Sequence, residues 1–130
     1  SRKKLQERFS QEVVLTPKEL SINSYDEEFL SNLKEVLDTN LVESDFNAEN
    51  FAASLGMSRM QLHRKLKAIT GLSTTEFIRS QRLKLAAQLL KKSEINISQV
   101  GYTVGFNNHS YFTKCFKEQF GVSPSEFAKS

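Results

Sequence analysis

The sequence has little of what secreted and membrane proteins need. It contains one cysteine, Cys115, in 130 residues, so no disulfide can form within the chain. No apolar run approaches the roughly 20 residues of a membrane-spanning helix. The amino-terminal end is charged and lacks the apolar stretch of a signal peptide. We therefore expect a cytoplasmic location and no membrane contact by this segment.

Motifs of catalysis and cofactor binding are missing as well. The chain has no Gly-rich phosphate loop and no histidine–carboxylate motif. His63 and His109 lie far apart in the sequence, and neither they nor Cys115 show the spacing of metal ligands. Cys115 falls on an apolar helical stripe, which favours a buried thiol over a redox switch. We expect neither an enzyme nor a bound cofactor or metal.

Charge is distributed unevenly along the chain. Residues 1–57 hold 6 Lys/Arg and 11 Asp/Glu, whereas residues 58–130 hold 12 Lys/Arg and 4 Asp/Glu. A basic half suggests a polyanionic partner such as nucleic acid. A solvated surface that is polarised by chance is the alternative at this point.

An alternating strand pattern is absent over any useful length, and the apolar residues recur at helical spacing. Ser24 with Glu27, and Ser73 with Glu76, match capping boxes, and Asn47 and Ser58 precede further helices. The sequence predicts an all-α fold of about seven helices after a linker at residues 1–23. The expected helices cover residues 25–41, 48–55, 58–70, 74–92, 97–104 and 108–120, with a short last one from residue 124.

A repeat organises the second half. Residues 59–77 laid over 109–127 are identical at five positions, at an offset of 50: Lys67 and Lys117, Gly71 and Gly121, Ser73 and Ser123, Glu76 and Glu126, Phe77 and Phe127. Each copy contains a short helix, a Gly-containing turn and a second helix, which is the helix-turn-helix arrangement. A small residue, Ala52 or Gly101, falls in each first helix and would let the two helices cross closely. Two ordinary helical hairpins are the alternative.

The second helices share a polar outward face. In the first copy the face holds Met60, His63, Arg64 and Lys67, and in the second it holds Ser110, Thr113, Lys114 and Lys117. Neither face carries an acidic residue, which favours DNA over a merely solvated surface. Arg64 is suited to guanine edges in the major groove. Met60 suits a thymine methyl group, or else belongs to the edge of the core.

These positions divide into two expected roles. The predicted readers of DNA bases are Met60, His63, Arg64, Ser110, Thr113 and Lys114. The predicted contacts to the DNA backbone are Ser58, Arg59, Lys67, Asn107, Asn108, His109 and Lys117, which lie at helix starts or further along the helices. The basic residues of the connecting helix, Arg79, Arg82 and Lys84, either touch backbone or are solvated.

The stretches "LGMSRMQLHRKLKAITG", "RLKLAAQLL" and "VGFNNHSYFTKCFKEQFGVSPSEF" resemble the DNA-binding domain of AraC/XylS-family transcription regulators. The resemblance implies two helix-turn-helix subdomains, at about residues 47–71 and 97–121, joined by a long helix at about residues 74–92 within a domain of residues 24–130. It also implies that double-stranded DNA is bound sequence-specifically, with the two recognition helices in successive major-groove segments. At 1.5 Å per residue, a connecting helix of about 19 residues would be roughly 28 Å long, which suits one DNA turn.

The preceding stretch, "SYDEEFLSNLKEVLDTNLVESDFNAENFA", is similar to the segment that joins a receiver domain to this module in hybrid two-component sensors of Bacteroides-type bacteria. The similarity implies receiver and histidine kinase domains in the same polypeptide and an output role in a phosphorelay. The acidic helix after Ser24 is then expected to face a receiver, a second copy or RNA polymerase. The alternative function is a helical protein-interaction module that couples a receiver domain to a partner.

Overall fold

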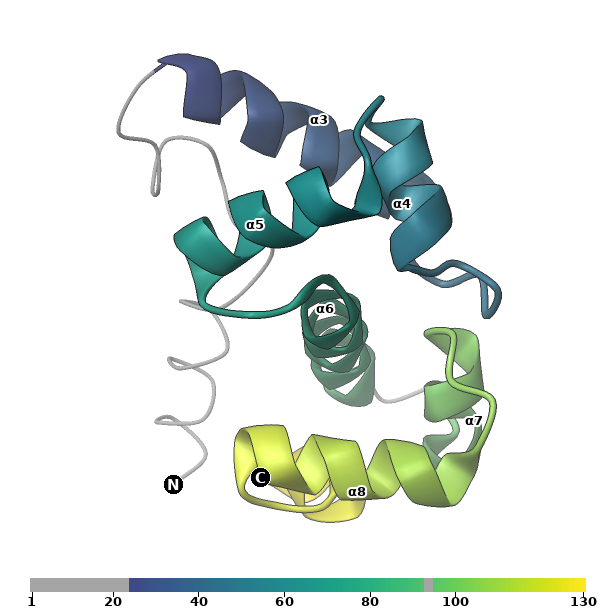
Figure 1. The fold of residues 1–130 in the computed structure, drawn as a ribbon. Coiled ribbons are helices and arrows are strands. Elements are labelled where there is room, and N and C mark those ends of the chain that lie inside the picture. The colour runs from purple at the N-terminus through teal and green to yellow at the C-terminus, as the bar shows by residue number, and fades with distance from the viewer. Residues whose placement is uncertain (1–23, 93–94) are drawn as a thin grey trace. The chain divides into compact units, whose positions relative to one another are not determined.

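The computed structural model describes residues 24–92 and 95–130, and these residues form helices and turns without a strand. The predicted all-α class is therefore confirmed, whereas the predicted linker at 1–23 lies outside the described residues. The domain boundaries stay a prediction. The seven helices (Figure 1) are α3 (Ser24–Asn40), α4 (Ala48–Ser54), α5 (Arg59–Thr70), α6 (Thr74–Leu90), α7 (Ile97–Thr103), α8 (His109–Phe120) and α9 (Pro124–Lys129).

Polar residues just ahead of the helices fix where they begin. The Asn47 side chain accepts the backbone N–H of Asn50 at 2.9 Å, and the Asn50 side chain accepts that of Asn47 at the same distance. Ser58 forms the same reciprocal box with Gln61. Each box satisfies two of the N–H groups that a helix start leaves unpaired. The sequence predicted caps at Asn47 and Ser58, and both are confirmed.

The two longer helices of the repeat end in the same way. Gly71 after α5 and Gly121 after α8 have φ of 80° and 82°, in the left-handed region that favours glycine. Their N–H groups donate to the carbonyls of Lys67 and Lys117 at 3.0 and 2.8 Å. The repeated glycines therefore act as helix stops, as their positions predict.

The chain folds as two compact units. Among the described residues, the first unit contains 24–41 and 45–79, and the second contains 42–44, 80–92 and 95–130. Helix α6 contributes its first turns to the first unit and the remainder to the second. Each unit therefore contains one copy of the repeated pair of helices, α4 with α5 or α7 with α8.

In the first unit, α3 is joined to α5 by a long-range ion pair. Lys65 Nζ lies 2.6 Å from the Asp26 carboxylate and 5.6 Å from the centre of the Phe29 ring. The three residues place the acidic start of α3 against the helix-turn-helix. Buried side chains fill the interior of this unit: Leu30, Leu33, Leu37, Leu41, Phe46, Phe51, Ala52, Leu62, Leu66, Phe77 and Ile78.

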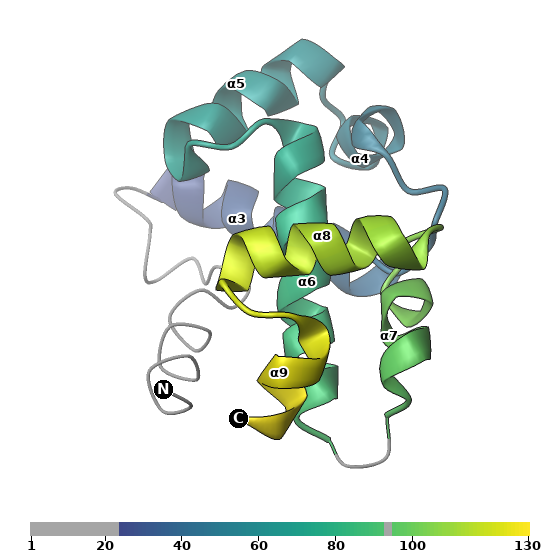
Figure 2. The same ribbon diagram turned by 90° about the horizontal axis from the view of Figure 1, so that it is seen from below.

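Phenylalanine dominates the core of the second unit. Figure 2 shows α7, α8 and α9 gathered around the later part of α6. The Phe116 ring lies 4.7 Å from that of Phe120 and 5.5 Å from that of Phe127, measured between ring centres. Cys115 is buried beside them, as its position on the apolar stripe predicts. Ring contacts of this kind give geometry-dependent stabilisation beyond the burial of area.

The connecting helix is shorter than predicted, because α6 ends at Leu90 and not at Lys92. The N–H groups of Lys91 and Lys92 bond the carbonyls three residues earlier, those of Gln88 and Leu89, which tightens the chain into a turn. The Lys91 ammonium donates to the Phe127 carbonyl at 2.9 Å and lies 4.3 Å from the centre of the Phe127 ring. Lys91 therefore binds the carboxyl end of α9, a contact 36 residues away that no local pattern reveals.

Candidate nucleic-acid interface

The outward face of α5 is exposed as its spacing predicts. His63, Arg64 and Lys67 are exposed, whereas Leu62 and Leu66 on the opposite face are fully buried. Helix α5 contains no acidic residue at any of its 12 positions. The first unit therefore presents a row of cationic and hydrogen-bonding side chains with no acidic side chain on the same helix.

Met60 belongs to this exposed face. Its side chain is 64% exposed, the largest value among the large apolar residues of the described segments. The alternative placement of Met60 at the edge of the core is therefore wrong. An exposed thioether next to polar neighbours suits contact with an apolar group of a partner, such as a thymine methyl.

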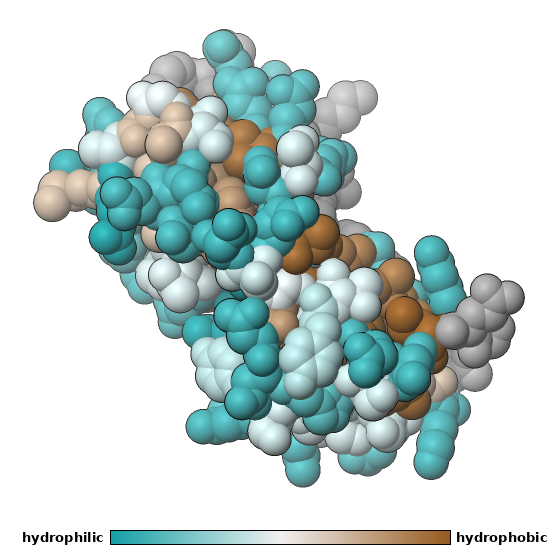
Figure 3. Space-filling view, turned by 90° about the vertical axis from the view of Figure 1, so that its right-hand side faces the viewer, coloured by the Kyte–Doolittle hydropathy of each residue, from teal (hydrophilic) through white to brown (hydrophobic). Residues whose placement is uncertain are grey.

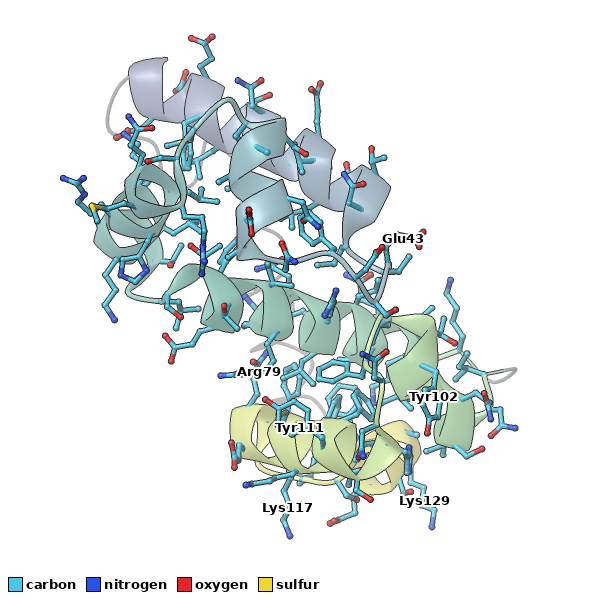
Figure 4. The ribbon with its side chains drawn as sticks, turned by 45° about the vertical axis from the view of Figure 1, so that its right-hand side comes forward. Glu43, Arg79, Tyr102, Tyr111, Lys117 and Lys129 are labelled. Carbon is cyan, nitrogen blue, oxygen red and sulfur yellow. The ribbon has the colours of Figure 1, made fainter. Side chains whose placement is uncertain are left out.

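Helix α8 presents a corresponding face in the second unit. Ser110, Lys114 and Lys117 are exposed, and Thr113 is half-buried. Lys117 points outward from α8 (Figure 4). Unlike α5, this helix carries an acidic residue, the exposed Glu118. Helix α8 as a whole is therefore less basic than α5.

The predicted backbone-contacting residues at the helix starts have structural roles of their own. Ser58 Oγ accepts the Gln61 N–H at 3.1 Å, and Asn108 Oδ1 accepts the Tyr111 N–H at 2.8 Å. Both acceptors are engaged in capping, but the Ser58 hydroxyl hydrogen and the Asn108 amide hydrogens remain donors. Capping is thus compatible with donation to a phosphate. Arg59 and Asn107 are exposed beside these caps.

His109 is less open than its position predicts. It is half-buried, its ring centre lies 6.3 Å from that of Phe112, and its Nδ1 is buried without a hydrogen-bond partner in the described structure. The ring is therefore partly committed to the edge of the core, and only Nε2 is a candidate for an external contact.

Two exposed tyrosines are not among the contact residues predicted from the sequence. Tyr102 on α7 and Tyr111 on α8 are 48% and 49% exposed (Figure 4). The Tyr111 ring also lies 6.1 Å from that of Phe106. At the repeat offset of 50, Tyr111 corresponds to Gln61. A comparison of the two copies of the repeat could therefore have singled out Tyr111. Both phenolic groups can donate a hydrogen bond to a partner.

The basic residues of α6 do not all face solvent. Arg82 is half-buried and donates from Nη2 to the Glu43 carbonyl at 2.8 Å. Burial lowers the pKa of the Arg82 guanidinium. Arg82 therefore binds the loop at residues 42–44. From the sequence we expected Arg82 either to contact the DNA backbone or to be solvated, and neither expectation describes this contact.

A hollow of about 390 Å³ lies next to α5 in the first unit. It is bordered by the amino-terminal ends of three helices. Its lining residues are Ala48 of α4, then Arg59, Met60 and His63 of α5, then Ser73, Thr74 and Thr75 at the start of α6. Two of the predicted base readers, Met60 and His63, thus border a concave site that the sequence did not predict.

Comparison with known proteins identifies the arrangement. Residues 51–130 match the family model described as "Helix-turn-helix domain". An AraC-type DNA-binding domain protein from Chromobacterium violaceum has a TM-score of 0.73 and 25% identity, over 82% of this chain and 95% of that one. The chain belongs to the AraC-type helix-turn-helix family. This is a family of DNA-binding domains of transcription regulators and not a family of enzymes.

Two further relatives bear on function. The DNA-binding domain of AdpA, solved in complex with a target DNA, has a TM-score of 0.66 and 29% identity, over 75% of this chain and 90% of that one. "Histidine kinase P4" of Formosa agariphila is 41% identical over 127 residues, which is 98% of this chain but 9% of that protein. The chain therefore spans a small part of this long relative.

The surface that faces the viewer in Figure 3 is mostly hydrophilic. Large apolar residues are exposed at only a few described positions: Val42, Met60, Tyr102 and Tyr111. In residues 24–92 and 95–130, no helix is long and apolar enough to cross a bilayer.

Proposed function

We propose that this AraC-type domain binds double-stranded DNA sequence-specifically, with α5 and α8 as its two recognition helices. The observation that carries the proposal is the exposed outward face of α5, where His63, Arg64 and Lys67 stand on a helix without acidic residues. A polyanionic duplex is the partner that such a face fits.

The side chains divide the work between bases and backbone. The proposed base readers are Met60, His63, Arg64, Ser110, Thr113 and Lys114, because they lie on the outward faces of α5 and α8. The proposed backbone contacts are Ser58, Arg59, Lys67, Asn107, Asn108, His109 and Lys117. Arg64 can donate two parallel hydrogen bonds to a guanine, whereas Lys67 and Lys117 lie later in their helices and suit phosphate.

Each unit is proposed to enter one of two successive major-groove segments. Helix α6 has 17 residues, so it is about 25 Å long at 1.5 Å per residue. The AdpA DNA-binding domain, solved in complex with a target DNA, supports binding to a duplex. The domain would then read two boxes without needing a second copy.

The relative called Histidine kinase P4 bears on the signalling system in which this domain acts. A protein called a histidine kinase that matches nearly the whole of this chain supports an output role in a phosphorelay. We infer covalently linked receiver and histidine kinase domains, action on DNA in the cytoplasm and no catalytic activity of this segment itself. The exposed acidic residues of α3, such as Glu35 and Asp38, suit contact with a protein and not with DNA.

Selection of bound sequences from a random duplex pool tests the proposal. Two conserved boxes about one helical turn, roughly 34 Å, apart are the expected result. The affinity for a selected duplex is then measured at several salt concentrations, and log K is expected to fall linearly with log salt. Binding that is absent or insensitive to salt would favour the alternative, a protein-interaction module.

A further inference from the structure

The first unit contains a concave site at the start of α6 that the base-reading roles do not explain. The first turn of a helix leaves N–H groups without a carbonyl one turn earlier, and it carries the positive end of the helix dipole. In α6 the N–H groups of Glu76 and Phe77 bond the Ser73 hydroxyl and carbonyl. The N–H groups of Thr74 and Thr75 have no such partner in the described structure.

Thr74 supplies a second and independent observation. It is only 4% exposed, and it is one of the residues that line the hollow. Its hydroxyl oxygen has no hydrogen-bond partner among the described residues. A buried hydroxyl without a partner is costly, and such a group in a folded protein calls for an explanation. An acceptor that enters the hollow would satisfy it.

The other lining groups indicate the charge of that acceptor. Arg59 borders the hollow with a permanently positive guanidinium, and His63 lies one turn further along α5. Thr75 adds an exposed residue with a second hydroxyl. Glu76 carries the nearby negative charge, but it does not line the hollow, and its carboxylate accepts the Ser73 N–H at 2.9 Å. Among the described residues, no acidic residue lines the hollow, so its polar groups are hydrogen-bond donors, hydroxyl groups and one permanent cation beside the apolar Ala48 and Met60.

The repeat shows that the second unit is built differently at the same place. At the offset of 50, Thr74 corresponds to Pro124, which has no N–H to donate, and Arg59 corresponds to His109. Pro124 occupies the first position of α9 and is buried. The same helical framework thus forms with proline at this position, while the amide donor and the hydroxyl are lost.

We propose that the hollow at the start of α6 is a phosphate-binding subsite for the DNA backbone, present in the first unit and absent from the second. A phosphate oxygen accepts from the N–H groups of Thr74 and Thr75 and from the Thr74 hydroxyl, and Arg59 neutralises its charge. The inference rests on the proposed function, because it places this phosphate at the edge of the groove that α5 reads. It makes the first unit the stronger anchor on the duplex.

The test uses the natural difference between the two units. Thr74→Pro gives the first unit the residue of the second and removes one N–H, at a helix position where proline is well tolerated. Thr74→Val removes only the hydroxyl. Thr39→Val is the control, because Thr39 is exposed on α3 and its hydroxyl donates to the Glu35 carbonyl. Circular dichroism and thermal melting establish that each variant is folded.

Affinities are measured on a selected duplex and on copies of it in which one phosphate at a time is replaced by an uncharged methylphosphonate. The wild-type domain is expected to lose about tenfold in affinity at one particular phosphate next to the first box. Thr74→Pro is expected to lose a similar factor on the unmodified duplex and to be insensitive to that replacement. Thr39→Val is expected to behave as wild type.

Thr74→Pro with wild-type affinity and wild-type sensitivity at every phosphate would overturn the subsite. If Thr74→Pro does not fold, Thr74→Val takes its place. Its affinity is then measured on the unmodified duplex and on the methylphosphonate duplexes, and the same comparison with the wild type decides the question. A wild-type domain that binds no duplex would contradict the proposed function itself. Failure of the subsite and failure of the proposed function can therefore be distinguished.

Discussion

Gly101 of α7 lies directly against the Phe112 ring of α8. A Cβ atom at Gly101 would be 2.7 Å from Phe112 Cγ and 2.8 Å from Cδ2, closer than two carbons can approach. In the first unit the corresponding residues are Ala52 and Leu62, both buried. The first copy thus combines alanine with leucine, whereas the second combines the smaller glycine with the larger phenylalanine. The glycine makes room for the ring and does not simply loosen the helix.

Gly101→Ala is therefore expected to destabilise the domain although alanine favours helix. Overpacking in a close-packed core costs about 1–3 kcal/mol, which exceeds the helix-propensity gain of about 1 kcal/mol at most. Denaturant unfolding measures the change. The double variant Gly101→Ala with Phe112→Leu gives the second unit the pair found in the first, and it should recover most of the stability lost in Gly101→Ala. Strictly additive effects of the two substitutions would show that this contact is not the cause.

The local features of the fold could be predicted from the sequence, because their causes are local. Asn47 and Ser58 precede helices and cap them, and Gly71 and Gly121 end helices. The periodicity of α5 also indicated which of its side chains are exposed. Such features depend on residues within one turn of each other, so the order of residues is enough to reveal them.

The contacts that were missed join residues far apart in the chain. Lys65 pairs with Asp26, and Arg82 with the Glu43 carbonyl, each across 39 positions. Nothing in the local pattern distinguishes these cations from the exposed Arg64. The hollow at Thr74 was missed for the same reason, since three helix starts meet there only after folding.

Arg64 and Lys117 are predicted to affect DNA binding in different ways. Arg64→Ala removes a base reader, so it should cost about 1–3 kcal/mol on the preferred duplex and relax specificity at one position of the site. Lys117→Ala removes a backbone contact, so it should weaken binding to all duplexes alike and lower the salt slope by about 1. Affinities for the selected duplex and its single-base variants measure both. Identical behaviour of the two variants would contradict the division into readers and anchors.

The ion pair between Lys65 and Asp26 is predicted to stabilise the packing of α3 in the first unit. The two side chains are 26% and 17% exposed, so water screens them less than an open surface pair. A double-mutant cycle with Lys65→Met and Asp26→Asn should give a coupling energy of about 1 kcal/mol in denaturant unfolding. Lys65→Met retains an apolar stem at this position.

The second ion pair on α3 provides the matched control. Lys34 and Asp38 lie 3.0 Å apart, but their side chains are 45% and 58% exposed. Exposed pairs four residues apart on a helix contribute about 0.3–0.5 kcal/mol. Equal coupling energies for the two pairs, or a larger one for Lys34 and Asp38, would refute the role given to the Lys65 pair.

The capping box at the start of α6 is predicted to make stability depend on pH. Hydrogen bonds from the Ser73 backbone and side chain lower the pKa of the exposed Glu76 carboxyl below its ordinary value of 4.5. A carboxyl with a depressed pKa in the folded state contributes stability that is fully present above the unfolded value and is lost as pH falls through the folded value. Glu76→Gln keeps an acceptor for the Ser73 N–H but has no charge. The wild type should therefore be more stable than Glu76→Gln at neutral pH, and the difference should shrink below pH 4.5.

Unfolding midpoints of both proteins between neutral pH and about pH 3 measure this difference. Glu126→Gln is the control, because Glu126 occupies the same place in the box at the start of α9 with a longer bond. Its carboxylate lies 3.4 Å from the Ser123 nitrogen, compared with 2.9 Å for Glu76 and Ser73. The longer and weaker bond should make Glu126→Gln the less destabilising of the two substitutions at neutral pH. A difference between wild type and Glu76→Gln that stays constant across the whole range would show that the charge on Glu76 does not contribute, and that its oxygen serves only as a neutral acceptor.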